Sequence, residues 1–184
     1  KQIVPENKLV LVPDGVSNEV ASCITLKGIT AEYLLHRAYP LKKGNKILYH
    51  AAAGGLGQIL CGWANSMGAE VIGTVGSKEK EAIAKKNGCH HVINYNEKNF
   101  VEEVEKIVGK NGIDVVYDGV GLTTFEGSIE VLKIRGMMVA FGNASGYVDT
   151  IDVKKHINAK GLFFTRPSIA HYTIEREELS LIHI

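Results

Sequence analysis

Lys46-Ile-Leu-Tyr-His-Ala-Ala-Ala-Gly-Gly-Leu-Gly57 is the stretch of sequence from which the fold is predicted. A short apolar run ends in small residues and glycines, and a helical pattern begins directly afterwards. Glycine lets a backbone turn approach a phosphate closely, and the first N–H groups of the following helix face the anion. We therefore expect a strand, a phosphate-binding turn and a helix in this order.

The composition is that of an ordinary soluble globular protein. The 184 residues suffice for one good core, and hydrophobic and charged residues make up 45% and 22% of them. A net charge of +1 provides no electrostatic basis for binding nucleic acid or an anionic membrane surface. No apolar run approaches the roughly 20 residues of a membrane span, and we expect neither a membrane span nor a signal peptide. The odd number of widely spaced cysteines, Cys23, Cys61 and Cys89, favours reduced thiols in a cytoplasmic protein.

Both ends of the chain favour a fragment of a longer protein. A strand-like run over residues 8–12 has no partner nearby, and a helical pattern begins at Glu175, shortly before the last residue. We expect neighbouring segments of the parent protein to complete both regions.

Apolar runs and helical patterns alternate along most of the chain. Residues 17–39 read as a helix in one or two pieces, with Gly28 as the candidate break and Pro40 as its end. The expected strands are 46–50, 70–75, 91–95, 113–118, 137–141 and 161–165. The expected helices run from the glycine turn to Gly68, from a Ser77 cap to Asn87, from an Asn96 cap to Gly109, and through Phe125, Ile129 and Leu132 to Gly136. Five strand–helix alternations predict an α/β fold with a Rossmann-type doubly wound parallel sheet.

The phosphate turn has the pattern Ala52-x-Gly54-x-x-Gly57, with alanine at the first glycine position of the dinucleotide-binding motif. A lone glycine pattern is a weak signal, but here a strand precedes it and a helix follows it, as the motif requires. The alternative is a tight turn that packs on glycine without a ligand. The sheet that follows favours a bound dinucleotide.

The end of the second strand predicts which dinucleotide is bound. An NAD site needs an acidic side chain about 20 residues beyond the glycines, where it holds the ribose 2′-hydroxyl. Counting from Gly57, 76 − 57 = 19 leads to Gly76, within Thr-Val-Gly-Ser-Lys-Glu-Lys at residues 74–80. No carboxylate stands at the strand end, whereas a glycine, a hydroxyl and two lysines suit a 2′-phosphate. The predicted cofactor is therefore NADPH.

Three side chains near this position have two interpretations each. Lys78 and Lys80 are either solvated charges on a first helical turn or ligands of the 2′-phosphate. Tyr95 is either a packing aromatic, the more usual role of a strand tyrosine, or a phenol that reaches the same phosphate.

Two further loops are expected at the carboxyl edge of the sheet. Residues 118–121, Asp-Gly-Val-Gly, follow the fourth strand, and residues 142–146, Gly-Asn-Ala-Ser-Gly, follow the fifth. Ligands of open α/β sheets bind at this edge, so both loops favour a ligand. The histidines have no metal-ligand spacing and are interpreted as structural or surface residues: His36, His50, His90, His91, His156, His171 and His183. No metal site, no Ser-His-Asp or Cys-His arrangement and no catalytic acid or base is expected.

With these residues in place, the chain closely resembles the zinc-independent, zeta-crystallin-like NADPH:quinone oxidoreductases of the medium-chain dehydrogenase/reductase superfamily. The resemblance spans residues 9–178. It is carried by residues 27–35, 50–57, 73–76, 92–95, 116–121, 141–146 and 165–168. Together these segments are far more specific than the glycine turn alone.

The resemblance implies a set of cofactor contacts. The pyrophosphate would be held by Gly54, Gly55, Leu56 and Gly57, and the 2′-phosphate by Gly76, Lys80 and Tyr95, with Lys78 left on the surface. The nicotinamide half of the site would be formed by Thr30, Val120, Phe141, Gly142, Asn143, Pro167 and Ser168. Family members use NADPH to reduce quinones or related electron-poor carbonyl compounds, and no residue here is implied as catalytic or as a zinc ligand.

The resemblance also implies a domain organisation. Residues 1–27 would be the end of a GroES-like catalytic domain with its connecting helix, and 28–172 the NADPH-binding Rossmann domain. Residues 173–184 would begin a truncated C-terminal segment, of which 180–184 depart from the family pattern and are a candidate non-native tail. The apolar strand at 161–165 would pair two copies into a homodimer. We expect the fragment to be catalytically incomplete.

Three different functions also fit parts of the sequence. The nearest is that of an enoyl or alkenal reductase of the same superfamily, whose evidence would lie in the missing domain. The second is that of a methyltransferase, which needs an acid for the ribose hydroxyls at the second strand, where this chain has none. The third is that of a non-catalytic dinucleotide-binding module.

Overall fold

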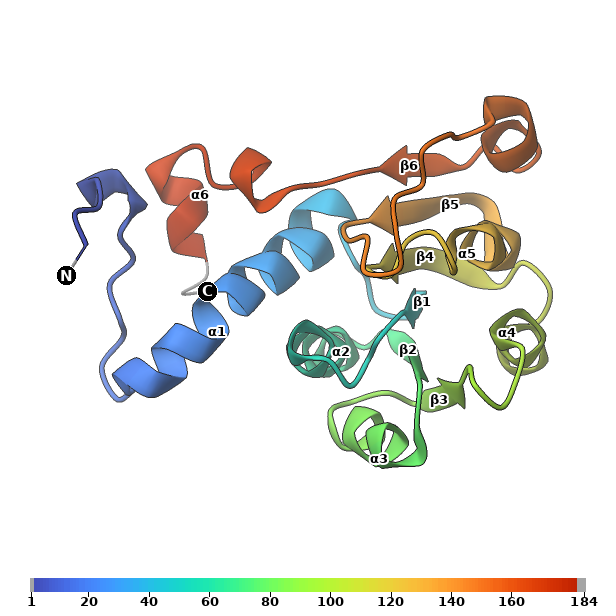
Figure 1. The fold of residues 1–184 in the computed structure, drawn as a ribbon, viewed down its shortest axis with the longest axis horizontal. Helices are drawn as coiled ribbons and strands as arrows, with labels where there is room; N and C mark the ends of the chain where they lie inside the picture. The colour runs from blue at the N-terminus through green and yellow to red at the C-terminus, as the bar shows by residue number, and fades with distance from the viewer. Residues whose placement is uncertain (1, 182–184) are drawn as a thin grey trace.

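The computed structural model describes residues 2–181 and contains a six-stranded parallel sheet in the order β3-β2-β1-β4-β5-β6 (Figure 1). The strands are β1 (Lys46–Tyr49), β2 (Glu70–Val75), β3 (His91–Asn94), β4 (Ile113–Asp118), β5 (Leu132–Ala140) and β6 (Phe163–Thr165). The predicted α/β class and doubly wound parallel sheet are confirmed. All six predicted strands are present, and the bounds of β2 and β4 are as predicted.

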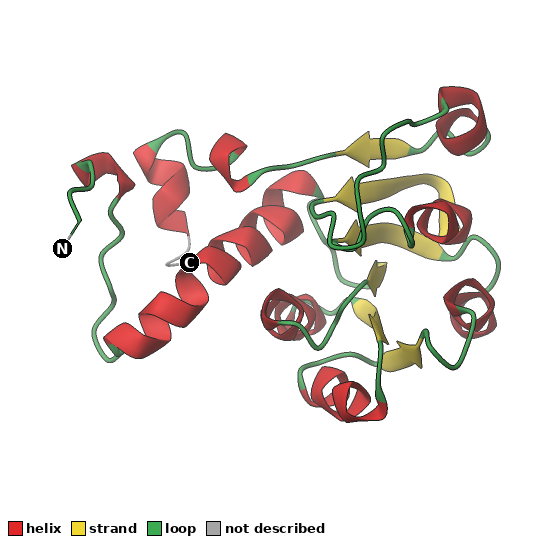
Figure 2. Ribbon diagram, in the orientation of Figure 1, coloured by secondary structure: helices red, strands yellow, loops and turns green. Residues whose placement is uncertain are grey.

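Helices cover both faces of this sheet (Figures 1 and 2). The helices are α1 (Asn18–Glu32), α2 (Gly55–Ser66), α3 (Lys78–Lys86), α4 (Phe100–Val108), α5 (Phe125–Val131) and α6 (Arg176–Ser180). Short helical segments are η1 (Glu6–Lys8), η2 (Tyr33–Ala38), η3 (Val153–Asn158) and η4 (Ile169–His171). The end of α1 with η2, α2 and α3 packs on one face, and α4 and α5 pack on the other.

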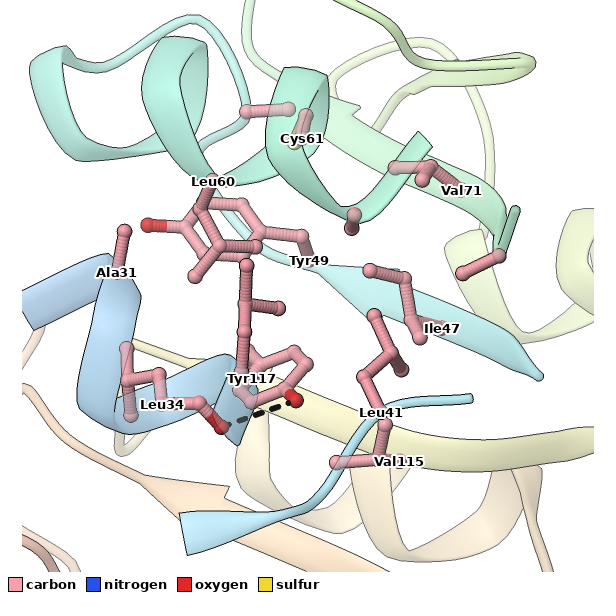
Figure 3. Packing of buried hydrophobic residues seen from close by; sticks show 14 of the residues in the cluster. Ala31, Leu34, Leu41, Ile47, Tyr49, Leu60, Cys61, Val71, Val115 and Tyr117 are labelled. Atoms are coloured by element: carbon pink, nitrogen blue, oxygen red, sulfur yellow. Dashed lines mark hydrogen bonds between the residues drawn. The ribbon is translucent and has the colours of Figure 1, made fainter. Parts of the chain in front are cut away.

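Alternation along the strands produces two hydrophobic cores, because successive strand side chains point to opposite faces. On β1, Ile47 and Tyr49 join the first core, whereas Leu48 joins the second. Figure 3 shows the first core between η2, the strands and α2. Within it, the buried phenol of Tyr117 donates a hydrogen bond of 3.2 Å to the carbonyl of Leu34 (Figure 3).

The N-terminal region differs from the sequence prediction in two respects. The strand-like run at residues 8–12 forms no strand, and within the described range 2–181 no strand pairs with it. Of the two alternatives for residues 17–39, the candidate break at Gly28 is absent, since α1 continues through it to Glu32 and then into η2. A helix-interior glycine costs about 1 kcal/mol, which the burial of Ile29 and Ala31 directly after it offsets.

Two helix boundaries also differ. Asn99, not Asn96, caps α4, and its side chain accepts a hydrogen bond of 2.9 Å from the Val101 N–H. Helix α5 ends at Val131, and Leu132 begins β5 rather than ending the helix. The pairing of Leu132 with Ile113 starts β5 early, and a register irregularity separates this pair from the regular ladder.

The C-terminal segment returns to η2. Arg37 donates hydrogen bonds to the Tyr172 carbonyl at 2.9 Å and to the Glu178 carboxylate at 3.3 Å. Helix α6 begins after Glu175, which forms a reciprocal capping box with Glu178, as the helical pattern at Glu175 predicts. The candidate tail at 180–184 lies largely outside the described residues, which end at 181.

Candidate cofactor site

The strand order creates a switch point between β1 and β4. From β1 the chain winds outward through β2 and β3, and then crosses back to β4 and outward again to β6. In open α/β sheets, the crevice outside the carboxyl ends of the strands at such a switch point is where ligands bind. The glycine turn follows β1 at this place.

The phosphate turn is a tight, strained connection. Ala51 has a positive φ of 62°, and the Gly54 N–H donates to its carbonyl at 2.9 Å. A Cβ on Gly57 would lie 2.5 Å from the Ala52 carbonyl oxygen, so the first turn of α2 fits only because residue 57 has no side chain.

Among residues 2–181, no side chain caps or neutralises the N-terminus of α2. Its N-cap, Gly54, forms no side-chain hydrogen bond, and its first turn contains no acidic residue. By contrast, α3 and α4 each have a capping side chain and acidic residues in the first turn. The free N–H groups and the positive end of the α2 dipole therefore suit an anion such as a pyrophosphate.

A basic side chain that the motif spacing does not indicate lies over this turn. Lys27 of α1 packs on Gly55, so that a Cβ on Gly55 would lie 2.5 Å from Lys27 Cε. Its ammonium group donates to the Cys23 carbonyl at 2.9 Å and forms no ion pair with any residue between 2 and 181. Lys27 belongs to residues 27–35, one of the segments that carry the family resemblance. Its place at the phosphate turn, however, follows only from the packing of α1.

Two of the three residues predicted for the 2′-phosphate are in contact. A Cβ on Gly76 would lie 2.6 Å from the Tyr95 hydroxyl oxygen, and Tyr95 is half exposed. The strand β3 ends at Asn94, so Tyr95 stands in the following turn and not in the sheet. It is therefore free of the packing role that a strand tyrosine usually has.

Lys80 stands on the first turn of α3 with an exposed side chain. Its N–H donates to the Ser77 side chain at 3.4 Å, which confirms Ser77 as the N-cap. The first acid after the end of β2 is Glu79, which is exposed. Hydrogen bonds with the Ser77 side chain and its own backbone amide lower the pKa of its carboxyl group. No acid stands at the end of β2 itself.

A cavity of about 580 Å³ lies along the carboxyl ends of β1, β2 and β4. The predicted residues Tyr95 and Val120 line it together with His50, Thr74 and Thr124, which the sequence patterns did not assign to the site. A polar residue at the carboxyl end of a buried parallel strand is the signal that would have found His50.

The two glycine loops at this edge interlock. The Ser145 N–H donates to the Val120 carbonyl at 2.8 Å, and the Leu122 N–H donates to the Gly146 carbonyl at 3.1 Å. A Cβ on Gly142 would clash with the Gly119 carbonyl oxygen, so both backbones are in direct contact. The loops after β4 and β5 thus form one continuous wall.

A second cavity, of about 490 Å³, brings together four residues predicted for the nicotinamide half: Thr30, Phe141, Pro167 and Ser168. Arg166 also lines it and donates to the Ala140 carbonyl at 2.7 Å and to Asn143 Oδ1 at 3.4 Å. Asn143 and Gly142 line a smaller neighbouring cavity. Arg166 is a cation at this end of the crevice that the site prediction did not include.

The residues from 2 to 181 provide no group of three His, Cys, Asp or Glu side chains arranged to hold a metal ion. None of the helices in the same range combines the length and the apolar surface that a bilayer-spanning helix needs.

A doubly wound sheet with an uncapped glycine turn at its switch point defines a Rossmann-type dinucleotide-binding domain. The model of the family described as "Zinc-binding dehydrogenase" matches residues 55–180, and the chain belongs to this family.

Individual relatives agree with the resemblance seen in the sequence. The chain is 47% identical to the quinone oxidoreductase of Salmonella typhimurium over 178 residues, covering 96% of this chain and 54% of the relative. It is 44% identical to the 2-haloacrylate reductase of a Burkholderia species over 182 residues, covering 97% of this chain and 55% of the relative. The chain therefore spans about half the length of the curated relatives it matches.

The solved structure of Escherichia coli quinone oxidoreductase in complex with NADPH has the same fold. It superposes with a TM-score of 0.91 at 44% identity, covering 96% of this chain and 54% of that chain. The fold class and the family resemblance predicted from the sequence are thereby confirmed. The individual cofactor contacts remain predictions.

Proposed function

We propose that this chain is the NADPH-binding part of an oxidoreductase that transfers hydride from NADPH to a quinone. The observation that carries the proposal is the uncapped glycine N-terminus of α2 at the switch point of the sheet. The similar quinone oxidoreductase whose solved structure contains NADPH supports the choice of cofactor.

The residues of the crevice fit such a cofactor. The backbone N–H groups of Gly55, Leu56 and Gly57 would hold the pyrophosphate, as the free N-terminus of α2 allows. Gly76 and Tyr95, which are in contact, would hold the 2′-phosphate together with Lys80.

At the other end of the crevice, the nicotinamide half would be enclosed by a group of residues that line three cavities: Thr30, Val120, Phe141, Gly142, Asn143, Pro167 and Ser168. When bound, NADPH supplies the hydride. The chain positions the cofactor and excludes water from it, and we assign no acid or base to its residues.

A second candidate acceptor is an electron-poor alkene. The similarity to a 2-haloacrylate reductase, at 44% identity, favours it to nearly the same extent as quinone. In the proposed organisation, residues 1–27 and 173–184 flank the cofactor domain at 28–172, and a GroES-like domain outside this chain forms much of the substrate pocket. A panel of quinones and activated alkenes, assayed with the full-length protein, would separate the two candidates.

A methyltransferase and a non-catalytic module can both be tested on this chain. A methyltransferase would bind S-adenosylmethionine in place of NADPH, and the end of β2 lacks the acid that it needs. If the chain is only a dinucleotide-binding module, NADPH binds but quinone-dependent NADPH oxidation is absent. We expect this incomplete outcome for the isolated chain, and measurable turnover would contradict it.

We also propose a homodimer in a cytoplasmic setting. The strand β6 is an edge of the sheet, and Phe163 on it is 56% exposed, which leaves a partly apolar edge for pairing with a second copy. Cys23, Cys61 and Cys89 are all free thiols, in keeping with a reducing compartment. Gel filtration with light scattering tests the dimer, and a monomer would contradict it.

The cofactor proposal is tested by calorimetric titration of the chain with NADPH and NADH. We expect NADPH to bind more tightly because of its 2′-phosphate. Binding of neither nucleotide would contradict the proposed function, and equal affinities would contradict the assignment of the 2′-phosphate residues.

A further inference from the structure

A chain of buried polar side chains connects the phosphate turn to the loop after β4. We call it the His50 network, and its members are His50, Thr74, Ser128, Asp118 and Thr124. The first four are at most 1% exposed, so every hydrogen bond between them is shielded from water. Buried polar groups of this kind are costly unless each has its partner.

Strand register explains why the network forms. Tyr49 of β1 lies opposite Gly73 of β2 and Tyr117 of β4. The next residue on each strand therefore lies at the same level of the sheet, and these residues are His50, Thr74 and Asp118. Ser128 of α5 packs above them and completes the chain of contacts.

Proton accounting assigns one tautomer to His50. The Ser128 hydroxyl donates its single proton to Asp118 Oδ2 at 3.3 Å. Its 3.0 Å contact with His50 Nε2 must then be a bond that it accepts, so Nε2 carries the imidazole proton. Nδ1 has a lone pair in this tautomer and accepts from the Thr74 hydroxyl at 2.9 Å. Both ring nitrogens are therefore satisfied in the neutral imidazole.

At one end of the network, the Asp118 carboxylate holds the loop that lines the crevice. Its Oδ1 accepts from the Val120 N–H at 2.7 Å and from the Gly121 N–H at 2.9 Å. Its Oδ2 accepts from the Thr124 hydroxyl at 2.7 Å. Since this loop interlocks with residues 142–146, the position of Asp118 fixes the whole wall.

At the other end, His50 immediately precedes the phosphate turn. The next residue, Ala51, adopts a positive φ of 62°, a conformation that alanine rarely takes. A strained backbone persists only where its surroundings hold it in place. His50 directly precedes the strained residue, and hydrogen bonds at both ring nitrogens hold its imidazole in place. It therefore supports the strained backbone at Ala51.

We propose that His50, as its Nε2–H tautomer, is a positioning residue. It holds the phosphate turn and the loop at residues 118–121 in a fixed position relative to each other. Its branch through Ser128 to Asp118 joins the two halves of the crevice. The consequence for cofactor affinity rests on the proposed function, whereas the tautomer and the loop order do not.

Two amide substitutions separate the branches of the network. In His50→Gln, the amide nitrogen occupies the place of Nε2 and can still donate to Ser128. In His50→Asn, the amide oxygen occupies the place of Nδ1 and can still accept from Thr74, but the Ser128 branch is lost. We expect His50→Asn to weaken NADPH and NADH alike by about tenfold, and His50→Gln by no more than about threefold.

A matched control lies outside the crevice. His156 of η3 is also buried and bonded at both ring nitrogens, to the Asp152 N–H at 3.1 Å and to Glu126 Oε1 at 3.1 Å. His156→Gln should lower stability without changing the affinity for either nucleotide. An equal loss of affinity in His156→Gln and His50→Asn would show a general effect of destabilisation and overturn the proposal.

A readout without nucleotide keeps the inference separate from the proposed function. We expect amide hydrogen exchange of Val120 and Gly121 to quicken in His50→Asn and to stay near the wild-type rate in His50→Gln and His156→Gln. Unchanged exchange in His50→Asn would overturn the proposal. If the Asn variant does not fold, nitrogen NMR of wild-type His50 decides, since an Nδ1–H tautomer would overturn the inference and an Nε2–H tautomer supports it. A wild-type chain that binds no nucleotide would refute the proposed function alone.

Discussion

The phenol oxygen of Tyr95 lies against the Cα of Gly76, although 19 positions (95 − 76) separate the two residues in the sequence. Residue 76 follows β2 and residue 95 follows β3, and these two strands are neighbours in the sheet. The absence of a side chain at 76 is what permits the contact, because a Cβ there would lie 2.6 Å from the phenol oxygen. This pair marks the part of the crevice where the 2′-phosphate is proposed to bind.

We predict that Gly76→Ala reduces the affinity for NADPH by about tenfold, the equivalent of one hydrogen bond to a charged group. The new methyl group displaces the phenol, which is half exposed and can swing into solvent with little loss of stability. NADH binding should hardly change, because NADH has no 2′-phosphate. Tyr95→Phe should have the same selective effect in fluorescence titrations, and an equal loss for both nucleotides would contradict it.

A second prediction concerns the first turn of α2. Gly57→Ala should destabilise the fold by about 1–3 kcal/mol, because the added methyl group meets the Ala52 backbone and no side chain can yield there. Gly62→Ala on the same helix is the matched control. Its methyl group would have only an ordinary 3.4 Å contact with the Asn87 carbonyl, and helix propensity favours alanine by up to about 1 kcal/mol. Urea unfolding compares the two, and equal effects would contradict the steric argument.

The third prediction follows from burial of His50. Burial lowers the pKa of His50 below its ordinary value of 6.5, with the Asp118 charge opposing the shift. In the unfolded chain the imidazole takes up a proton near pH 6.5, whereas in the folded chain it stays neutral to lower pH. The stability that neutral His50 contributes is therefore fully present above pH 6.5 and is lost as the pH falls from 6.5 toward the lower folded pKa.

The pH dependence of urea unfolding, measured between about pH 5 and 8, checks this sign. His50→Gln removes the titrating group, so its stability should fall less steeply on acidification than that of the wild type. The remaining histidines contribute equally to both proteins and cancel in the difference. Parallel curves would show that His50 titrates alike in the folded and unfolded states.

Much of the fold follows from local sequence signals. The runs that form β2 and β4 are rich in β-branched residues and are bounded by glycine or turn residues, so their limits could be predicted. The start of β5 could not be predicted from the sequence, because Leu132 continues a helical apolar pattern. Its strand pairing with Ile113 is a tertiary contact. Likewise, Gly28 signals a helix break locally, and only packing around α1 overrides it.

The candidate site shows the same division. The glycine turn and the Gly76 region follow from motif spacing, which reports what the backbone must do next to a phosphate. The position of His50 at the carboxyl end of a strand is a local signal for a site residue, but its role in the network has no such signal, because its partners lie 24 and 78 positions away. Local sequence patterns also do not identify Lys27 as a site residue, because only the packing of α1 on α2 brings it to Gly55.

The most direct test of NADPH selectivity is the pair of dissociation constants for NADPH and NADH, measured by calorimetry on the wild type and on Lys80→Ala. Lys78→Ala, two residues away on the same helical turn, is the control. We predict that the wild type prefers NADPH, and that Lys80→Ala weakens NADPH by about tenfold while NADH stays within about twofold. Equal wild-type affinities, or an equal loss for both nucleotides in Lys80→Ala, would contradict the assignment of this site to the 2′-phosphate.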